Sequence, residues 1–152
     1  MKKILIIGGG AMGSAFSIPC LENNNQVIIT EPYNKTFVKN LSSKKKFHPS
    51  LKLNLPKKLQ FKHYIKNIFK EKFDLIVVAL SLHGIDFIGR ELKDLKLKTP
   101  ILILTKGLKY DKKNKKIFTI PELLKKKYNV SNISVLKGPC IAKNLANKNL
   151  TR

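Results

Sequence analysis

The sequence is poor in three features that direct a chain to particular classes of protein: cysteine, long apolar runs and arginine. Its two cysteines, Cys20 and Cys140, are too few for a disulfide-stabilised scaffold, and we expect both to be reduced thiols. Apolar runs such as residues 75–80 are far shorter than the ~20 residues of a membrane-spanning helix. The first apolar run ends at Gly8 and does not predict a signal peptide. We therefore expect a cytoplasmic protein without a membrane span.

Arginine is nearly absent although the chain is strongly basic. The net charge is +22, and 29 of the 31 basic residues are lysines. Nucleic-acid recognition favours the planar fork of arginine, and the lysines are scattered over every segment. A solvated lysine-rich surface explains this distribution better than a dedicated basic binding face. We predict no nucleic-acid partner, although the positive charge should attract anionic metabolites and cofactors.

The most informative segment is a glycine-rich stretch near the N-terminus. Residues 4–7 form a short apolar run that predicts a buried parallel strand. The turn that follows has the spacing G-x-G-x-x-G at Gly8, Gly10 and Gly13, and residues 11–21 predict a helix. In this order the motif is typical of dinucleotide binding, because the glycines permit a tight turn, a close approach of the backbone to a pyrophosphate and close helix packing. The helix N-terminus adds N–H groups and the positive end of the helix dipole.

A carboxylate follows the next predicted strand, residues 26–30, at the position of a cofactor contact. Glu31 stands 18 residues after Gly13, which fits the acidic residue that accepts hydrogen bonds from the adenosine ribose. A glycine turn without a ligand is the alternative interpretation, and the agreement of strand, turn, helix and acid disfavours it. The carboxylate would repel the 2′-phosphate of NADP, and no arginine stands at positions 32–34. We predict NAD as the preferred cofactor, with NADP possible.

The rest of the chain alternates predicted strands and helices. We expect strands at residues 59–61, 74–80, 101–104 and 133–136, helices at residues 33–41, 64–72, 85–95, 117–128 and 141–147, and loops at residues 42–56 and 111–116. Without a repeat or a low-complexity linker, this predicts a single Rossmann-type α/β domain over residues 1–152, a doubly wound, mostly parallel sheet with helices on both faces. Ligands of such sheets bind beyond the carboxyl ends of the strands. We therefore expect the glycine turn to share one crevice with residues 81–84, 105–107 and 138–140.

Lys106 is the strongest candidate for chemistry outside the glycine turn. It directly follows a predicted buried strand, so its ammonium should face the ligand and hold a phosphate or carbonyl oxygen. His83 and Cys140 also follow strands, but we interpret them as a helix-start or packing residue and a crevice-lining residue. His48 and His63 lie in a predicted loop and at a predicted helix start, with no acid or cysteine at ligand spacing. We therefore predict no metal site.

Four stretches of the chain carry motifs that belong together. They are residues 8–15 (GGGAMGSA), 74–79 (DLIVVA), 104–108 (LTKGL) and 136–143 (LKGPCIAK). Together they resemble the N-terminal domain of NAD(P)-dependent glycerol-3-phosphate dehydrogenase, and T-K-G-L and G-P-x-x-A-K are the specific pieces. The resemblance covers essentially the whole chain. It implies hydride transfer between the nicotinamide and dihydroxyacetone phosphate, giving sn-glycerol 3-phosphate for phospholipid synthesis.

The resemblance also implies roles for individual residues. With the glycine turn included, the cofactor-binding residues are Gly8, Gly10, Ala11, Met12, Gly13, Glu31, Pro32, Lys106 and Ala142. The substrate-binding residues are Lys106, Gly138 and Cys140. Of these, Lys106 is implied to be catalytic, because it would contact both the cofactor and the substrate. The family usually has Ser or Thr where Cys140 stands, so a hydroxyl donor is replaced by a poor donor here.

The family continues into an all-helical domain with a second catalytic lysine and most of the substrate phosphate contacts, whereas this chain ends at Arg152. We therefore expect a truncated product or half of a split enzyme whose helical half is a separate partner. Two alternatives remain open. One is a fragment of a ketopantoate-reductase-like oxidoreductase, and the other is a stand-alone dinucleotide-binding or regulatory module without turnover.

Overall fold

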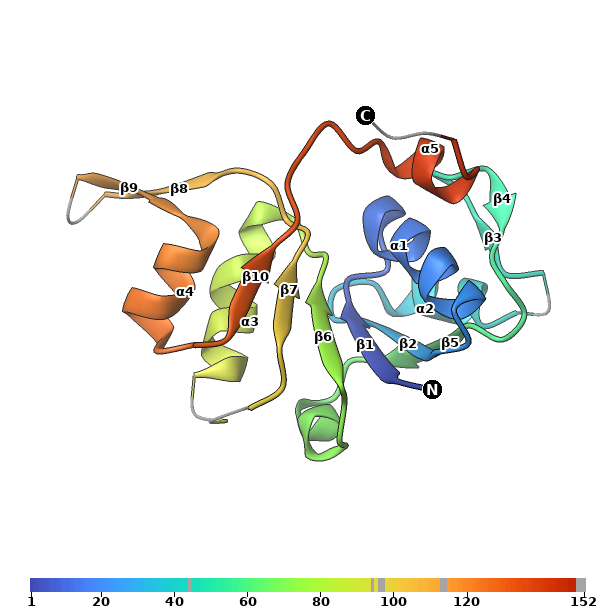
Figure 1. The fold of residues 1–152 in the computed structure, drawn as a ribbon, viewed down its shortest axis with the longest axis horizontal. Coiled ribbons are helices and arrows are strands. Elements are labelled where there is room, and N and C mark those ends of the chain that lie inside the picture. Colours follow the sequence, from blue (N-terminus) through green and yellow to red (C-terminus); the bar gives the residue numbers. More distant parts are fainter. Residues whose placement is uncertain (44, 94, 96–97, 113–114, 150–152) are drawn as a thin grey trace.

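A six-stranded sheet in which all paired strands are parallel forms the centre of the protein (Figure 1). The structure is a computed structural model that describes residues 1–43, 45–93, 95, 98–112 and 115–149. The strands in spatial order are β10 (Ile133–Val135), β7 (Ile101–Ile103), β6 (Leu75–Val78), β1 (Lys3–Ile7), β2 (Gln26–Glu31) and β5 (Gln60–His63). The direction of chain progression reverses between β1 and β6. This reversal is the topological switch point of a Rossmann-type sheet, so the predicted fold is confirmed.

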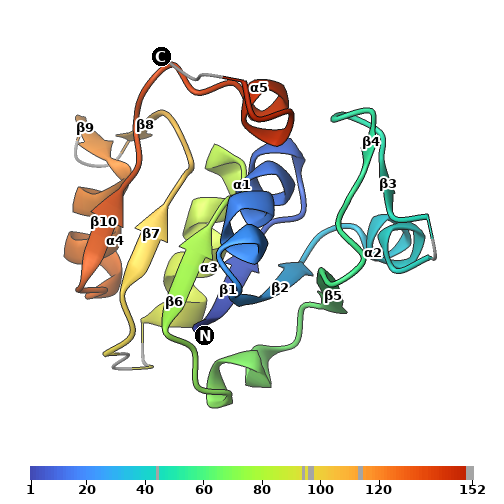
Figure 2. The same cartoon turned by 45° about the vertical axis from the view of Figure 1, so that its right-hand side comes forward.

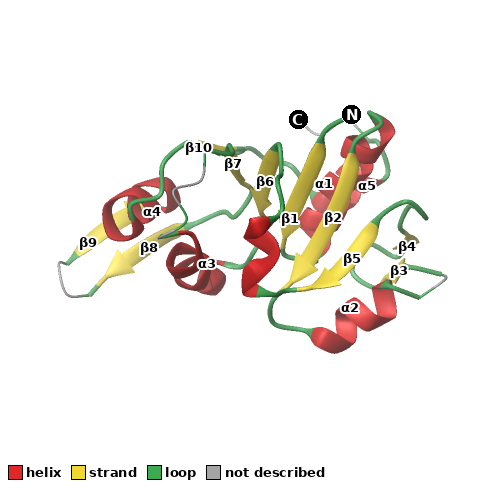
Figure 3. Ribbon diagram, turned by 90° about the horizontal axis from the view of Figure 1, so that it is seen from below, coloured by secondary structure: helices red, strands yellow, loops and turns green. Residues whose placement is uncertain are grey.

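Helices cover both faces of the sheet (Figure 3). Helices α1 (Ala11–Glu22) and α5 (Ala142–Ala146) lie on one face, and α3 (Ile85–Leu92) and α4 (Ile120–Tyr128) lie on the other. The continuous apolar run of β1 explains this sandwich, because successive side chains of a strand point to opposite faces. Ile4 and Ile6 join the core under α1 and α5, whereas Leu5 and Ile7 join the core under α3 and α4.

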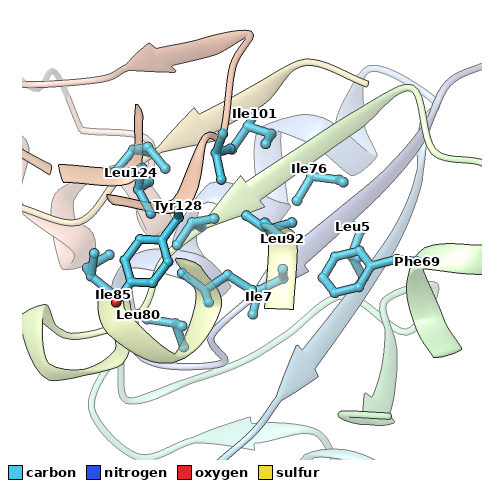
Figure 4. Close-up of a cluster of buried hydrophobic side chains, with 14 of the residues drawn as sticks. Leu5, Ile7, Phe69, Ile76, Leu80, Ile85, Leu92, Ile101, Leu124 and Tyr128 are labelled. Atoms are coloured by element: carbon cyan, nitrogen blue, oxygen red, sulfur yellow. The ribbon is translucent and has the colours of Figure 1, made fainter. Parts of the chain in front are cut away.

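The core under α3 and α4 is the larger of the two, and Figure 4 shows its side chains. Tyr128 lies so close to α3 that a Cβ atom at Gly89 would be 2.4 Å from its Cδ2 atom. Its hydroxyl donates to Asp86 Oδ1 over 2.6 Å, and Lys109 and Lys127 form ion pairs with the same carboxylate at 2.9 and 3.0 Å. Burial opposes the charge of Asp86, but these three partners outweigh it and hold the pKa of the carboxyl group well below its usual range.

Residues 64–72 do not form the predicted helix. Only a 3₁₀ turn, η1 (Lys66–Lys70), is present there. Ile68 and Phe69 of this turn are buried, whereas Ile65 is 58% exposed, so the apolar residues do not form one helical face. The segment is fixed by tertiary contacts instead, including a 2.6 Å hydrogen bond from the Tyr64 hydroxyl to Glu91. His63, predicted at the helix start, is the last residue of strand β5.

The predicted helix over residues 117–128 begins three residues later than expected. Strands β8 (Leu108–Asp111) and β9 (Lys116–Thr119) pair antiparallel, and both overlap the predicted loop at residues 111–116. The helix starts after Thr119 because Thr119 and Glu122 form a capping box, in which each side chain bonds the backbone N–H of the other residue. The spacing T-x-x-E was present in the sequence and would have given the correct boundary.

Residues 42–56 were predicted as an exposed loop, and this prediction is wrong for part of the segment. After α2 (Lys35–Leu41), the chain forms a small antiparallel hairpin of β3 (Phe47–His48) and β4 (Leu53–Asn54), which lies beyond the β5 edge of the sheet in Figure 2. His48, Leu51 and Leu55 are buried and so form part of the interior of the protein. The hairpin thereby brings a histidine to the interior beside the glycine turn.

Candidate functional site

The glycine turn lies at the switch point of the sheet, between the carboxyl ends of β1 and β6. Gly8 has a φ of +112°, and a Cβ atom there would be 2.6 Å from the carbonyl oxygen of Ala79. At Gly13 a Cβ atom would be 2.1 Å from the carbonyl oxygen of Gly8. Both positions therefore require glycine, because backbone atoms occupy the space of a side chain.

Gly10 differs from the other two glycines of the motif. Its φ is −64°, and apart from Gly10 and its two chain neighbours no atom of the described residues lies within 4 Å of a Cβ atom built on it. The space beside Gly10 is therefore open, as the close approach of a ligand to this backbone requires.

The N-terminus of α1 starts at this open side. Gly10 is the N-cap residue of the 12-residue helix, and it makes no side-chain cap hydrogen bond. The first turn contains no acidic residue. Backbone N–H groups at a helix start have no partner within the helix, and together with the positive end of the helix dipole they favour an anion. The open glycine and this helix end together fit the pyrophosphate of a dinucleotide.

Glu31 lies next to the turn at the end of β2, with its carboxylate held in place by two backbone groups. Oε2 accepts a 2.8 Å hydrogen bond from Gly9 N, and Oε1 accepts a 3.0 Å hydrogen bond from Tyr33 N. Pro32, which stands between Glu31 and Tyr33, is half-buried. A carboxylate has more lone pairs than these two donors use, so Glu31 can still accept from hydroxyl groups of a ligand.

His48 also contacts the turn, although the sequence did not indicate it. Its side chain is 1% exposed, and Nε2 lies 3.1 Å from the carbonyl oxygen of Gly9. Leu51 N donates to Nδ1 over 3.3 Å, and the ring packs edge-on against Phe37. Burial lowers the pKa of His48 below its usual value, although its backbone hydrogen bonds act in the opposite direction. His48 is therefore a neutral residue of the interior at neutral pH.

Lys106 lies at the other end of the crevice, after β7. Its Nζ donates to the carbonyl oxygens of Gly138 and Cys140 over 2.8 and 3.2 Å, and the residue is exposed. Lys106 and Met12 line a hollow of about 260 Å³ together with Ala79, Leu80, Leu104 and Thr105. The hollow connects the start of α1 to Lys106, so these two predicted site residues do lie at one edge of the sheet.

The segment after β10 approaches the same edge. Gly138 has a φ of +139° and is exposed, and Cys140 is half-buried. Ala142 begins α5, which packs against α1, and Ala142 is partly buried in that contact. His83, in the 3₁₀ turn η2 (Leu82–Gly84), is exposed. The structure thus brings the strand-end segments together, but it leaves the Gly138–Cys140 side open.

The residues that the structure describes contain neither a metal-binding cluster nor a helix that could cross a membrane. Among these residues, no group of three or more His, Cys, Asp and Glu side chains could hold a metal ion. Among the same residues, none of the helices combines the length and the apolar character needed to cross a membrane.

The sheet order and the glycine turn at its switch point define the class of the protein as a Rossmann-type domain of the dehydrogenase kind. The particular family follows from the sequence as a whole. A family model described as "NAD-dependent glycerol-3-phosphate dehydrogenase N-terminus" matches residues 3–152. The chain therefore belongs to this family, as its motifs predict. A comparison with curated protein sequences gives no match.

Solved structures show the same fold. Glycerol-3-phosphate dehydrogenase from Coxiella burnetii is 20% identical with a TM-score of 0.76, and the match covers 96% of this chain and 43% of that protein. The enzyme from Plasmodium falciparum is 21% identical with a TM-score of 0.77, covering 99% of this chain and 44% of that protein. A protein from Enterococcus faecalis described as a 2-dehydropantoate 2-reductase gives 21% identity and a TM-score of 0.60, covering 88% and 40%. The chain thus spans less than half of each of these proteins.

Proposed function

We propose that this chain is the cofactor-binding domain of an enzyme that transfers a hydride between NAD(H) and dihydroxyacetone phosphate, giving sn-glycerol 3-phosphate. The observation that carries the proposal is the glycine turn, whose Gly10 faces open space at the switch point. A hollow joins this turn to Lys106. The family match over residues 3–152 supports the same conclusion.

The residues at the turn fit one half of a dinucleotide. Gly8, Gly10 and Gly13 shape the backbone beside which the pyrophosphate would bind, and the start of α1 supplies N–H donors. Glu31, with Pro32 next to it, would accept hydrogen bonds from the adenosine ribose. The fixed carboxylate and the lack of arginine at positions 32–34 favour NAD over NADP, although Lys35 and the net charge of +22 favour the phosphate of NADP.

The residues at the other end fit the reacting groups. The nicotinamide supplies the hydride chemistry when it is bound, and the protein orients the reactants. Lys106 would hold an oxygen of the substrate by charge and hydrogen bonding, as a catalytic residue that also touches the cofactor. Gly138 and Cys140 would line the glycerol phosphate, and Met12 and Ala142 the cofactor. Lys106 already donates to the carbonyl oxygens of Gly138 and Cys140, so its ammonium group is held beside these two residues.

The substrate half of the site would be completed by a second domain. The chain covers 43% and 44% of two solved glycerol-3-phosphate dehydrogenases, and the Lys106 side of its crevice is exposed. In this proposal residues 1–152 are one NAD-binding domain, and a helical substrate domain belongs to the same or a separate chain. Positioning groups act together, so the chain alone should bind cofactor without useful turnover.

A stand-alone dinucleotide-binding module is the second candidate function. The exposure of Lys106 and Gly138 favours it, because an open substrate side suits binding without chemistry. A fragment of a 2-dehydropantoate reductase is less well supported, since the family model that matches is that of glycerol-3-phosphate dehydrogenase.

Calorimetric titration of the chain with NADH and NADPH tests the proposal. We expect NADH to bind, and to bind more tightly than NADPH at physiological salt. Addition of the second domain of a longer relative should then produce NADH oxidation that depends on dihydroxyacetone phosphate. If NADH binds but no second domain restores turnover, the stand-alone module is the better description. A chain that binds neither dinucleotide would contradict both.

A further inference from the structure

The peptide unit between Gly9 and Gly10 is held by more contacts than a glycine turn needs. The carbonyl oxygen of Gly9 accepts a 2.9 Å hydrogen bond from Ser14 Oγ, and it lies 3.1 Å from His48 Nε2. Both side chains are buried, at 0% and 1% exposure. The backbone N–H of Gly9 donates to Glu31. Three separate segments of the chain therefore fix one residue of the turn.

The tautomer of His48 follows from its two partners. Leu51 N donates to Nδ1, so Nδ1 acts as an acceptor and carries no proton. The proton of the neutral ring is then on Nε2, which donates it to the Gly9 carbonyl oxygen. Packing against Phe37 and burial keep the ring in this orientation.

The direction of the Gly9 carbonyl determines the direction of the next N–H group. A trans peptide is planar, so the C=O of Gly9 and the N–H of Gly10 point in opposite directions. Since the carbonyl points to the buried side chains of Ser14 and His48, the N–H of Gly10 points away from them. Gly10 itself is exposed and borders the open space described above.

Holding this peptide requires such contacts because both of its residues are glycines. Glycine has no Cβ atom, and it populates positive and negative φ about equally, so the backbone itself does not prevent a flip of the Gly9–Gly10 peptide. A flipped peptide would turn a carbonyl oxygen toward the position of an anion. Hydrogen bonds from Ser14 and His48 to the carbonyl oppose this flip.

We propose that His48 is a positioning residue for cofactor binding, which holds the Gly9 carbonyl inward so that the Gly10 N–H faces the pyrophosphate of the dinucleotide. This inference rests on the proposed function, since it takes the ligand of the turn to be NAD(H). His48 touches neither cofactor nor substrate in this role. It acts through the Gly9–Gly10 peptide and shares that task with Ser14.

Variants of the chain test this role, with NADH and ADP as calorimetric probes at neutral pH. His48→Phe keeps an aromatic ring but removes the donor. His48→Gln places an amide N–H close to the position of Nε2 and restores it. Leu55→Ala, at a buried residue that follows the same hairpin, removes packing without a hydrogen bond to Gly9 and serves as the matched control for loss of stability. Thermal unfolding of each variant fixes a temperature at which all are folded.

We expect His48→Phe to weaken the binding of NADH and ADP by about three- to tenfold, the loss that corresponds to one hydrogen bond. His48→Gln and Leu55→Ala should remain within about twofold of the original chain. Adding Ser14→Ala to His48→Phe should cost more than the sum of the two single changes in free energy, because the second donor then no longer holds the peptide.

Unchanged binding by His48→Phe would overturn the role of His48 while leaving the proposed function intact. Equal losses in His48→Phe and His48→Gln, or a similar loss in Leu55→Ala, would also overturn it, since they would indicate a purely structural effect. An original chain that binds neither NADH nor ADP would overturn the proposed function and this inference together. These outcomes are distinguishable because the first is read from the variants and the last from the unchanged chain.

Discussion

The two ends of the crevice are built differently. At the glycine turn, Gly8, Gly9 and Gly13 are buried, and Glu31 and His48 hold the backbone by hydrogen bonds. At the other end, Lys106 and Gly138 are exposed, and the side chain of Lys106 bonds only loop carbonyls among the described residues. Contacts within this domain therefore determine the first end almost completely, whereas the groups at the second end are exposed.

The two ends of the crevice would divide the work of the proposed enzyme between them. A pyrophosphate needs fixed backbone donors, and a parallel sheet with its first helix supplies them without any further domain. A small phosphorylated substrate needs enclosure by several side chains, and one open sheet edge does not supply this. The following changes test whether the two ends are as different as they look.

Gly13→Ala should have the largest effect, and on the fold itself. The new Cβ atom would lie 2.1 Å from the carbonyl oxygen of Gly8. Neither atom belongs to a flexible side chain that could turn aside, so β1 and α1 would have to separate. We expect a loss of at least ~3 kcal/mol in the free energy of unfolding, measured by urea denaturation. A variant that unfolds like the original chain would show that the turn is not tightly built.

Lys106→Ala should affect ligand binding only at the Lys106 end of the crevice. We expect the affinity for glycerol 3-phosphate to fall by about ten- to a hundredfold, or ~1.5 to 3 kcal/mol, because a charge-assisted hydrogen bond is lost. The affinity for ADP-ribose should stay within about twofold. The measurement uses this chain joined to the second domain of a longer relative. Lys112→Ala is the control, and equal behaviour of both variants would make Lys106 an ordinary surface lysine.

Gly10→Ala should affect cofactor binding at the glycine turn without affecting folding. Beyond its chain neighbours, a methyl group at this position meets no atom of the described residues within 4 Å, and the φ of −64° suits alanine, so stability should change by less than ~0.5 kcal/mol. The same methyl group would occupy the space proposed for the pyrophosphate. We expect NADH to bind at least about tenfold, or ~1.4 kcal/mol, more weakly by calorimetry. Unchanged NADH affinity would place the ligand elsewhere.

Asp86→Asn should weaken the fold away from the crevice. The carboxylate joins α3 to α4 and β8 through Tyr128, Lys109 and Lys127. Loss of its charge should cost about 1 kcal/mol of unfolding free energy at pH 7 without any change in NADH affinity. Because its folded pKa is lowered, this contribution is present above pH ~4 and is lost as the pH falls through the folded pKa. The unfolding free energy of the variant should therefore fall less steeply with decreasing pH than that of the original chain.

The smallest expected effect is a pH dependence of stability due to His48. Burial lowers its pKa below the usual 6.5, so the unfolded chain binds more protons between pH 6.5 and the folded pKa. This stability is present above pH 6.5 and is lost as the pH falls through the folded pKa. We expect His48→Gln to remove up to about 1 kcal/mol of the difference in unfolding free energy between pH 7.5 and pH 5.5.

Local patterns allowed most of the fold to be predicted. The strand at residues 4–7, the glycine spacing and the helix after it are adjacent in sequence, and each follows from side-chain size and hydrophobicity. The predictions failed where distant contacts override local preference. Residues 64–72 have a helical spacing, but Tyr64 bonds Glu91 and Ile65 is exposed, so only a short 3₁₀ turn forms. Strand β9 replaced the start of a predicted helix because Thr119 caps that helix.

The candidate site divides in the same way. Gly10 was identified from the spacing of the glycine motif, and Glu31 from its distance to that motif. Lys106 was identified because it follows a strand, and strand ends of a parallel sheet meet at one edge. The sequence by itself also determined the sheet, the glycine turn and the family, since these depend on short-range spacing. Only the tertiary structure decided that His48 holds Gly9, 39 residues away, and that Lys106 bonds Gly138, 32 residues away. Such pairs depend on where the chain returns after a loop, and the packing of the whole domain determines that position.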